Sequence, residues 1–169
     1  VDIETVNLNA DAAADLDLTN LSMATAGATM TLNVTGDSAL IVSGLGADVT
    51  TVNASGMSVG GSVTQGARLS TGAVTYTGSA GADTFIMNNF GDTIVGGAGG
   101  DTLIINTAAI LGGINVNLAA TGNNILSANG GAIAGSATGF TSVDLSGYTG
   151  TFGAVVTSAV KGSTITGTG

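Results

Sequence analysis

Short stretches that alternate apolar and polar residues recur along this chain at a nearly constant interval. Met30, Leu32 and Val34, for example, alternate with Thr and Asn, and this pattern predicts a short β-strand with one buried face. A short strand followed by a tight corner, repeated regularly, predicts an all-β fold of the solenoid type. We expect a right-handed parallel β-solenoid or β-roll, with a β-sandwich as the alternative because sandwiches also contain regularly spaced short strands. The centres of the predicted strands lie near residues 7, 17, 32, 41, 52, 63, 75, 85, 94, 103, 115, 125, 144, 155 and 165.

The composition also favours strands over helices. The 29 glycines argue against long helices, and only residues 10–14 have the alanine content for a helical turn. Proline is absent, which suits interior strands that must donate their N–H groups to neighbours on both edges.

The charge of the chain narrows the range of partners. Lys and Arg number 2 against 11 Asp and Glu, which gives a formal net charge of −9. Nucleic acid and anionic lipid are excluded, because phosphate binding needs clustered basic residues. No apolar stretch approaches the ~20 residues of a membrane span, so we expect no membrane insertion. Divalent cations are the natural partners of such acidity.

Cysteine and aromatic contents point to a metal as the stabilising element. The chain has no cysteine, which excludes disulfides and thiolate metal sites. Aromatic residues make up only 4% of the chain, so its core is poor in large side chains. Secreted domains with thin cores are usually held together by disulfides or by a metal.

Residues 78–104 divide into three nonapeptides, GSAGADTFI, MNNFGDTIV and GGAGGDTLI. Asp83, Asp92 and Asp101 are nine residues apart, and each is followed by Thr and a large apolar residue. The third copy fits GGxGxDxUx (U is apolar) at every defined position, the first departs only at Ser79, and the second lacks the glycines. Glycines allow positive φ angles and convergent carbonyls, and Asp supplies the charged oxygen that Ca²⁺ prefers.

This pattern resembles the RTX (repeats-in-toxin) nonapeptide of bacterial proteins exported by type I secretion, which form a calcium-bound parallel β-roll. The resemblance implies two nonapeptides per turn, so that loops 78–83 and 96–101 stack and Asp83 and Asp101 share one Ca²⁺. It also implies carbonyl ligands from both loops, here Gly78, Ala80, Gly97 and Gly99. In such a roll Phe85 and Leu103 point inward from one sheet and Ile94 from the other. Residues 84–86 then pair in parallel with 102–104.

Two further aspartates are weaker candidates for metal ligands. Asp92 falls on the opposite side of the roll, where it has no well-formed partner loop, although Asn88 could assist it. Asp48 lies in SGLGADVTT (43–51), which has glycines in register but Thr50 where an apolar residue belongs. Asp48 either binds an ion at another corner or caps a turn.

We expect three segments within a longer protein: a β-solenoid strand array (1–76), the RTX-like calcium segment (77–105) and a second strand array leading to a further repeat (106–169). Related stretches at 3–10, 49–57 and 140–148 indicate a repeat unit of about 90 residues. Asn7, Asn53 and Asp144 occupy equivalent positions in these stretches. We expect their side chains to hydrogen-bond to the next coil rather than bind metal.

The sequence argues against an enzyme. Residues 56–60 match the nucleophile pattern GxSxG, but the chain has no histidine for a Ser-His-Asp triad. A β-helical polysaccharide lyase or hydrolase is a fairer rival. Such enzymes usually bind sugar on aromatic platforms, whereas this chain has no Trp and only 2 Tyr. A lyase also needs a cationic group near its base, and Arg68 and Lys161 are the only candidates.

Beyond the nonapeptides, the strand arrays rich in Thr, Ala, Gly and Asn are similar to bacterial S-layer proteins of the RTX-containing type. This resemblance implies a secreted, extracellular protein of the bacterial cell surface that binds calcium and associates with its own copies. Cell-surface polysaccharide is a further candidate partner. The alternative is a stalk or binding module of a large RTX adhesin.

Overall fold

The fold was obtained as a computed structural model, which describes residues 2–66, 68, 72–106, 113–128, 131–150, 152–159 and 162–167. Within these ranges the protein is all-β, as predicted, and contains no helix. Accordingly, no helix long and apolar enough to cross a membrane occurs in the described part of the chain.

Most of the strands lie in two parallel sheets. Sheet A contains, in spatial order, β1 (Thr5–Ala10), β3 (Met30–Gly36), β5 (Val49–Met57), β7 (Thr75–Thr77), β9 (Thr93–Val95) and β13 (Ser136–Thr138). Sheet B contains β2 (Ala14–Asp17), β4 (Ala39–Ser43), β6 (Ser62–Gln65), β8 (Thr84–Met87), β10 (Asp101–Ile105), β14 (Phe140–Asp144) and β16 (Ile165–Thr166).

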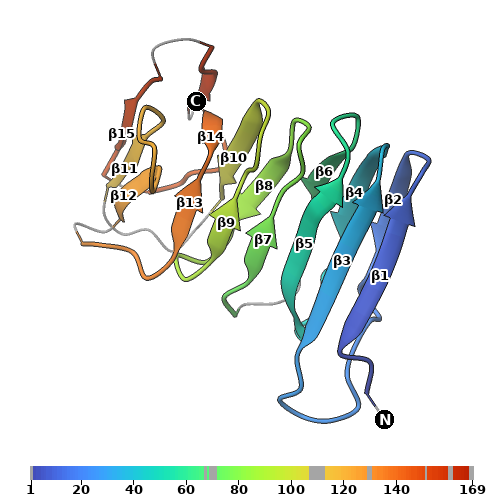
Figure 1. Cartoon of the computed structure of the whole chain (residues 1–169). Coiled ribbons are helices and arrows are strands. Elements are labelled where there is room, and N and C mark those ends of the chain that lie inside the picture. Colours follow the sequence, from blue (N-terminus) through green and yellow to red (C-terminus); the bar gives the residue numbers. More distant parts are fainter. Residues whose placement is uncertain are drawn as a thin grey trace.

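From β1 to β10 the chain alternates between the two sheets, with odd-numbered strands in sheet A and even-numbered strands in sheet B. Each pair of strands therefore adds one step along the molecule, and Figure 1 shows these steps from the N-terminal to the C-terminal end. All fifteen predicted strand centres fall within strands, and β13 is the one described strand that the sequence pattern did not predict. The parallel pairing of 84–86 with 102–104 is confirmed by Thr84↔Thr102, Phe85↔Leu103 and Ile86↔Ile104.

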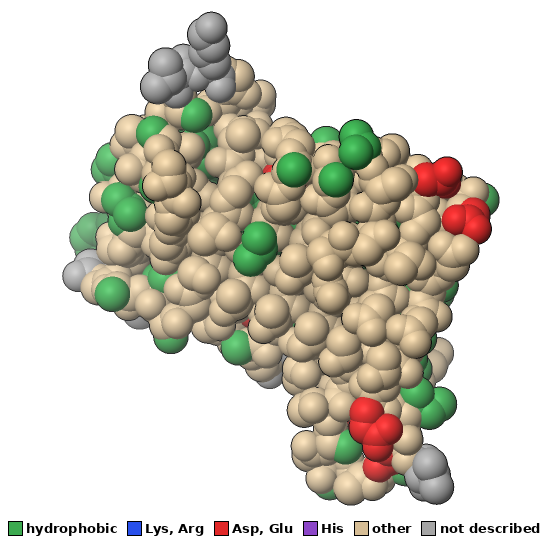
Figure 2. Space-filling view, viewed as in Figure 1, with side chains coloured by type: hydrophobic (Ala, Val, Ile, Leu, Met, Phe, Trp, Pro, Cys, Tyr) green, Lys and Arg blue, Asp and Glu red, His purple; other side chains and the backbone are tan. Residues whose placement is uncertain are grey.

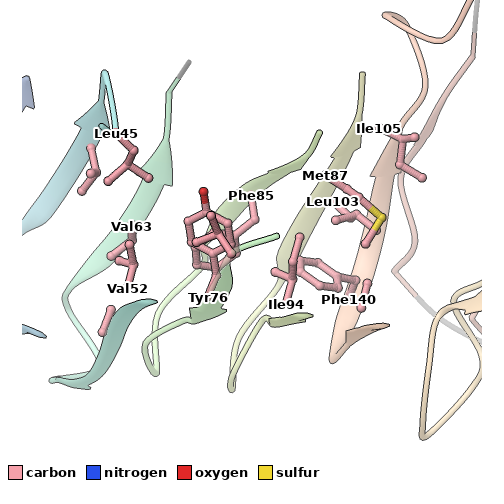
Figure 3. Packing of buried hydrophobic residues seen from close by; sticks show 14 of the residues in the cluster. Leu45, Val52, Val63, Tyr76, Phe85, Met87, Ile94, Leu103, Ile105 and Phe140 are labelled. Atoms are coloured by element: carbon pink, nitrogen blue, oxygen red, sulfur yellow. The ribbon is translucent and has the colours of Figure 1, made fainter. Parts of the chain in front are cut away.

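The core lies between the two sheets. Phe85 and Leu103 are fully buried side by side in sheet B, and Ile94 is fully buried in sheet A, as predicted. Phe85 packs against Tyr76 at a ring-centroid distance of 5.5 Å and against Phe140 at 6.5 Å. These three rings lie in the middle of the cluster in Figure 3, and they concentrate the few aromatic residues of the chain around the nonapeptide segment.

The regular alternation is interrupted after β10. β11 (Ile114–Asn117) and β12 (Ile125–Ala128) form an antiparallel hairpin, which makes a small third sheet with β15 (Ala154–Thr157). Two hydrogen bonds close the hairpin: the Asn117 N–H donates to the Asn124 carbonyl at 2.7 Å, and Asn124 Nδ2 donates to the Asn117 carbonyl at 2.9 Å. The backbone N–H of Asn124 donates instead to the Ala137 carbonyl of β13. Sheet A resumes only at β13, which pairs with β9.

The predicted equivalence of Asn7, Asn53 and Asp144 is wrong for Asp144. Asn7 and Asn53 lie in sheet A with Asn33 between them in register, whereas Asp144 lies in sheet B. Asn33 Nδ2 donates to Asn7 Oδ1 at 3.0 Å, which is the expected bond between coils. Asp144 accepts a hydrogen bond from the Ser146 N–H two residues on, and Asn53 accepts one from the Ser55 N–H in the same way, so the bond between coils is shown for Asn7.

Candidate metal centre

Asp83 lies in the corner immediately before β8, and its side chain points into the molecule. Its Oδ1 accepts a hydrogen bond from the backbone N–H of Val63, one coil earlier, at 2.5 Å. Its Oδ2 accepts one from the N–H of Ser79 in its own loop at 2.6 Å. Residue Asp83 is only 1% exposed, so these N–H donors replace the water that a surface carboxylate would bind.

Asp101 lies one coil further on, at the start of β10. Its Oδ1 accepts the backbone N–H of Asp83 at 2.9 Å, across 18 residues of chain. The two predicted ligands therefore lie in adjacent stacked coils, as the nonapeptide register requires. Asp101 is fully buried, and its Oδ2 has no hydrogen-bond partner.

Electrostatics make this carboxylate pair costly to keep ionised. Burial raises the pKa of Asp101 to about 6, opposed by the Asp83 N–H and reinforced by the neighbouring charge of Asp83. Burial also raises the pKa of Asp83, although the N–H groups of Val63 and Ser79 lower it in part. Neither carboxylate forms an ion pair with a described basic side chain. A proton or a cation bound to such a buried pair of carboxylates would reduce the cost of burying their charges.

The two glycine-rich loops are in close contact. The Ala98 N–H donates to the Ser79 carbonyl at 3.2 Å, which joins loop 96–101 to loop 78–83. Gly97 and Gly99 adopt φ angles of 108° and 124°, and a Cβ on Gly99 would overlap the Gly81 carbonyl oxygen. The glycines of the repeat are therefore needed for the close approach of the coils as well as for their backbone conformation.

Oxygen atoms from both loops meet beside Gly78. A Cβ at Gly78 would overlap the Gly96 carbonyl oxygen and lie 2.6 Å from Asp83 Oδ2. A Cβ at Gly96 would lie 2.7 Å from Asp101 Oδ2. The absence of side chains at both glycines thus lets the two loops approach closely, with carboxylate and carbonyl oxygens, the donor atoms that Ca²⁺ prefers, beside the contact.

The predicted ligands are distributed as follows in the structure. Asp83, Asp101, Gly78, Ala80, Gly97 and Gly99 all belong to the two stacked loops. In the described part of the chain, no three acidic side chains gather in one cluster. An ion between the loops would therefore take most of its ligands from backbone carbonyls, with Asp101 Oδ2 as the uncommitted carboxylate oxygen.

Asp92 lies on the other side of the molecule, before β9 of sheet A, as predicted. Its Oδ1 accepts hydrogen bonds from Arg68 Nη1 at 3.0 Å and from the Val74 N–H at 2.9 Å. Its Oδ2 accepts the Asn89 N–H at 3.1 Å. The side chains of Asp92 and Arg68 are 0% and 1% exposed, so this is a buried ion pair. Both oxygens of Asp92 are thereby occupied without a metal ion.

Arg68 is surrounded by buried polar groups on this side. Burial raises the pKa of Tyr76 to about 12, and the nearby charge of Arg68 lowers it in part. Gln65 is also buried, and its Oε1 accepts the Ile86 N–H at 3.0 Å. The Arg68 position therefore has a structural role, and Lys161, the other basic residue, lies outside the described residues.

Asp48 lies at a third corner, before β5. Its Oδ2 accepts the Met23 N–H at 2.8 Å, and its carbonyl accepts the Met30 N–H at 2.8 Å. These bonds hold the loop between β2 and β3, which agrees with the turn-capping alternative for Asp48.

Sequence reasoning missed two contributors to these centres. Ser79 Oγ donates either to Asp83 or to the Gly61 carbonyl, each at 3.0 Å, and the signal was its departure from glycine in the repeat. Arg68 was considered only as a catalytic cation, although one of two basic residues in so acidic a chain is a natural partner for a buried Asp.

Comparison with known proteins adds no assignment: no family model, no curated protein and no solved structure matches this chain.

Proposed function

We propose that this chain is a calcium-binding structural segment of a secreted bacterial surface protein of the S-layer type. In this proposal the strands form a right-handed parallel β-solenoid with a β-roll at the nonapeptides. Ca²⁺ binds between loops 78–83 and 96–101, orders the stacked coils and supports association of the protein with its own copies. The segment has no catalytic role.

The observation that carries the proposal is the buried carboxylate pair. Asp83 and Asp101 lie in adjacent coils, have no basic partner among the described residues, and Asp101 Oδ2 has no hydrogen-bond donor there. Leaving such an oxygen buried and unpaired is unfavourable, whereas a divalent cation would satisfy it and offset the repulsion between the two carboxylates. The resemblance of both loops to the RTX nonapeptide supports calcium as that cation.

Residues Asp101, Asp83 and the carbonyls of Gly78, Ala80, Gly97 and Gly99 would hold the ion. Since Asp83 already accepts two backbone N–H groups, we assign the direct carboxylate ligand to Asp101 first. Bound Ca²⁺ would supply positive charge and a fixed oxygen coordination between two coils. Binding only to the folded chain would then stabilise it by mass action.

Titration calorimetry with CaCl₂ on the EDTA-treated chain tests the proposal. We expect binding with a Kd of ~10⁻⁴–10⁻³ M, as in extracellular calcium modules. We also expect calcium to change the circular dichroism spectrum toward that of a more ordered chain. Asp101→Asn should abolish most of the binding. The double variant with Asp83→Asn should be little worse, because both residues act through one site. Asp11→Asn on the exposed N-terminal surface is the matched control and should bind calcium as the unmodified chain does.

No calcium heat for the unmodified chain, or equal losses in the Asp101 variant and the Asp11 control, would refute the assignment. Electron microscopy of the native cell surface tests the S-layer part separately, because a lattice is expected there and a stalk module would give none.

A further inference from the structure

In the described part of the chain, the exposed charged residues lie at the N-terminal end of the molecule, and Asp144 near the other end is only partly exposed. In the N-terminal coils, Glu4, Asp11, Asp15, Asp17 and Asp37 are all exposed. Between β5 and β10 the charged residues are Arg68, Asp83, Asp92 and Asp101, and all four have buried side chains. Figure 2 shows the prominent acidic side chains at the N-terminal end and, over the middle, an expanse of uncharged side chains and backbone, coloured tan.

The outer face of sheet A is uncharged along its full length, and its side chains form two rows. The first row, one residue per strand in register, is Thr5, Thr31, Thr51, Thr75, Thr93 and Ser136. The second row is Asn7, Asn33, Asn53, Thr77, Val95 and Thr138. Between them runs the inward row that includes Leu32, Val52 and Ile94, so both outer rows face solvent.

The outer face of sheet B is also uncharged in its middle, where Thr64, Thr84 and Thr102 lie in register, but its ends are charged. Asp15 and Asp17 lie at one end of this face and Asp144 lies near the other. In an antiparallel pair of sheet B faces these two ends would meet and repel, whereas the outer face of sheet A carries no such charges.

We propose that the outer face of sheet A, centred on β5, β7 and β9, is a self-association surface that binds the same face of a second copy in antiparallel orientation. The proposal rests on the proposed self-assembling function and names its contact face. We refer to this surface, defined by the two rows above, as the sheet A face.

Two properties make a second copy the fitting occupant. First, both faces repeat at the strand spacing of ~4.8 Å, so hydroxyl and amide groups of one copy meet those of the other in a common register. Thr, Ser and Asn each donate and accept hydrogen bonds, which lets identical rows satisfy one another. Second, an antiparallel two-fold arrangement places the acidic N-terminal coils of the two copies at opposite ends of the pair.

The size of the surface indicates weak pairing. The two rows extend roughly 24 Å across six strands and roughly 7 Å along them, an area on the order of 200 Å², which is well below the ~800 Å² per partner of a standard interface. We therefore expect association of isolated chains only at high concentration, with avidity in an array of many copies.

Sedimentation equilibrium of the chain in millimolar calcium, from about 10 μM to about 1 mM, tests the proposal. The average mass should rise with concentration. Thr75→Glu with Thr93→Glu places two charges on adjacent strands of the sheet A face and should keep the chain monomeric. The matched control, Thr64→Glu with Thr84→Glu, adds the same charges to adjacent strands on the outside of sheet B. It should associate like the unmodified chain.

A second measurement uses the absence of cysteine from the chain. Thr75→Cys, at the centre of the face, should form disulfide-linked dimers on mild oxidation several-fold faster than Thr84→Cys. Both measurements are interpreted for variants whose circular dichroism matches that of the unmodified chain.

An unmodified chain that stays monomeric throughout, equal behaviour of the two charge variants, or equal cross-linking of the two cysteines would overturn the proposal. One further outcome would overturn the proposal in favour of a carbohydrate partner. In that outcome the unmodified chain stays monomeric and binds cell-surface polysaccharide, and the sheet A variant does not bind it. Calcium calorimetry is read independently, so concentration-dependent association without calcium binding would sink the proposed calcium function and leave this surface intact.

Discussion

The coils built from β1–β6 and the coils built from β7–β10 use the same two sheets but place most of their aspartates in opposite ways. The exception in the first region is Asp48, whose Oδ2 accepts the Met23 N–H. In the first region Asp11, Asp15 and Asp37 project into solvent, and the corner N–H groups bond to backbone carbonyls, as Asp37 N–H does to Ala10. In the second region Asp83 and Asp101 turn inward and themselves accept N–H groups of an earlier coil.

The number of residues per coil also differs between the two regions. Asn7 and Asn33, bonded between neighbouring coils of the first region, are 26 residues apart, whereas Asp83 and Asp101 are 18 residues apart. In the short coils of the second region, the Asp83 and Asp101 carboxylates accept the N–H groups at the corners. The comparison teaches that a repeated Asp in this fold is first a structural acceptor, and that only an Asp with an oxygen left over is available for a metal ion.

The largest effect is expected from charging the aromatic core of the second region. Phe85→Asp places a carboxylate beside Tyr76 and Phe140 without a partner, and we expect it to lower the free energy of unfolding by more than about 4 kcal/mol. Thr84→Asp, one residue away on the outer side of β8, should cost less than about 1 kcal/mol. Urea unfolding monitored by circular dichroism measures both, and similar losses would contradict the packing described.

The buried ion pair provides the next largest effect. Asp92→Ala leaves Arg68 buried without its partner and removes the acceptor of the Val74 and Asn89 N–H groups. We expect a loss of about 3–5 kcal/mol by denaturant unfolding. Asp37→Ala in the first region should change the unfolding curve little. A large loss there would remove the distinction between inward and outward aspartates.

The pH dependence of the calcium-free chain sharpens the comparison further. Since the folded pKa of Asp101 is raised to about 6 from an ordinary value of 3.8, the folded chain binds more protons than the unfolded chain between these values. The contribution of Asp101 to the free energy of unfolding therefore falls by up to about 3 kcal/mol as the pH rises from about 4 to about 6. Asp101→Asn should remove this part of the fall and leave the part that comes from Asp83, whose pKa burial also raises. Exposed aspartates such as Asp17, whose pKa is lowered by Thr19, contribute in the opposite direction. Thermal unfolding of both chains in EDTA across this range measures the difference.

The smallest effect concerns the close approach of the coils. Gly99→Ala would force a Cβ against the Gly81 carbonyl at a φ angle of 124°, and we expect a loss of about 1–3 kcal/mol. Gly36→Ala in the first region meets the Ala10 carbonyl at a φ of 117° and should cost as much. Gly122→Ala has open space around it and should be nearly silent in the same thermal unfolding assay. A loss confined to Gly99 would show that only the nonapeptide coil is tightly packed.

The sequence by itself determined where the strands lie and which of them stack in the nonapeptide segment. Period-two alternation is a local property, so strand positions could be predicted without the fold. The eighteen-residue step follows from the nine-residue register together with the two nonapeptides per coil that the resemblance implied. The inward positions of Phe85, Ile94 and Leu103, and the placement of Asp92 opposite Asp83 and Asp101, follow from the same register.

Only the tertiary structure decided the rest, because it depends on coils of unequal length. The hairpin β11–β12 delays the return to sheet A, so Asp144 falls in sheet B although its surroundings resemble those of Asn7. The pairing of Arg68 with Asp92, 24 residues away, and the free oxygen of Asp101 are contacts between coils that no local pattern encodes. The two uncharged rows of sheet A arise in the same way, since their residues come into register only when six separate coils are stacked.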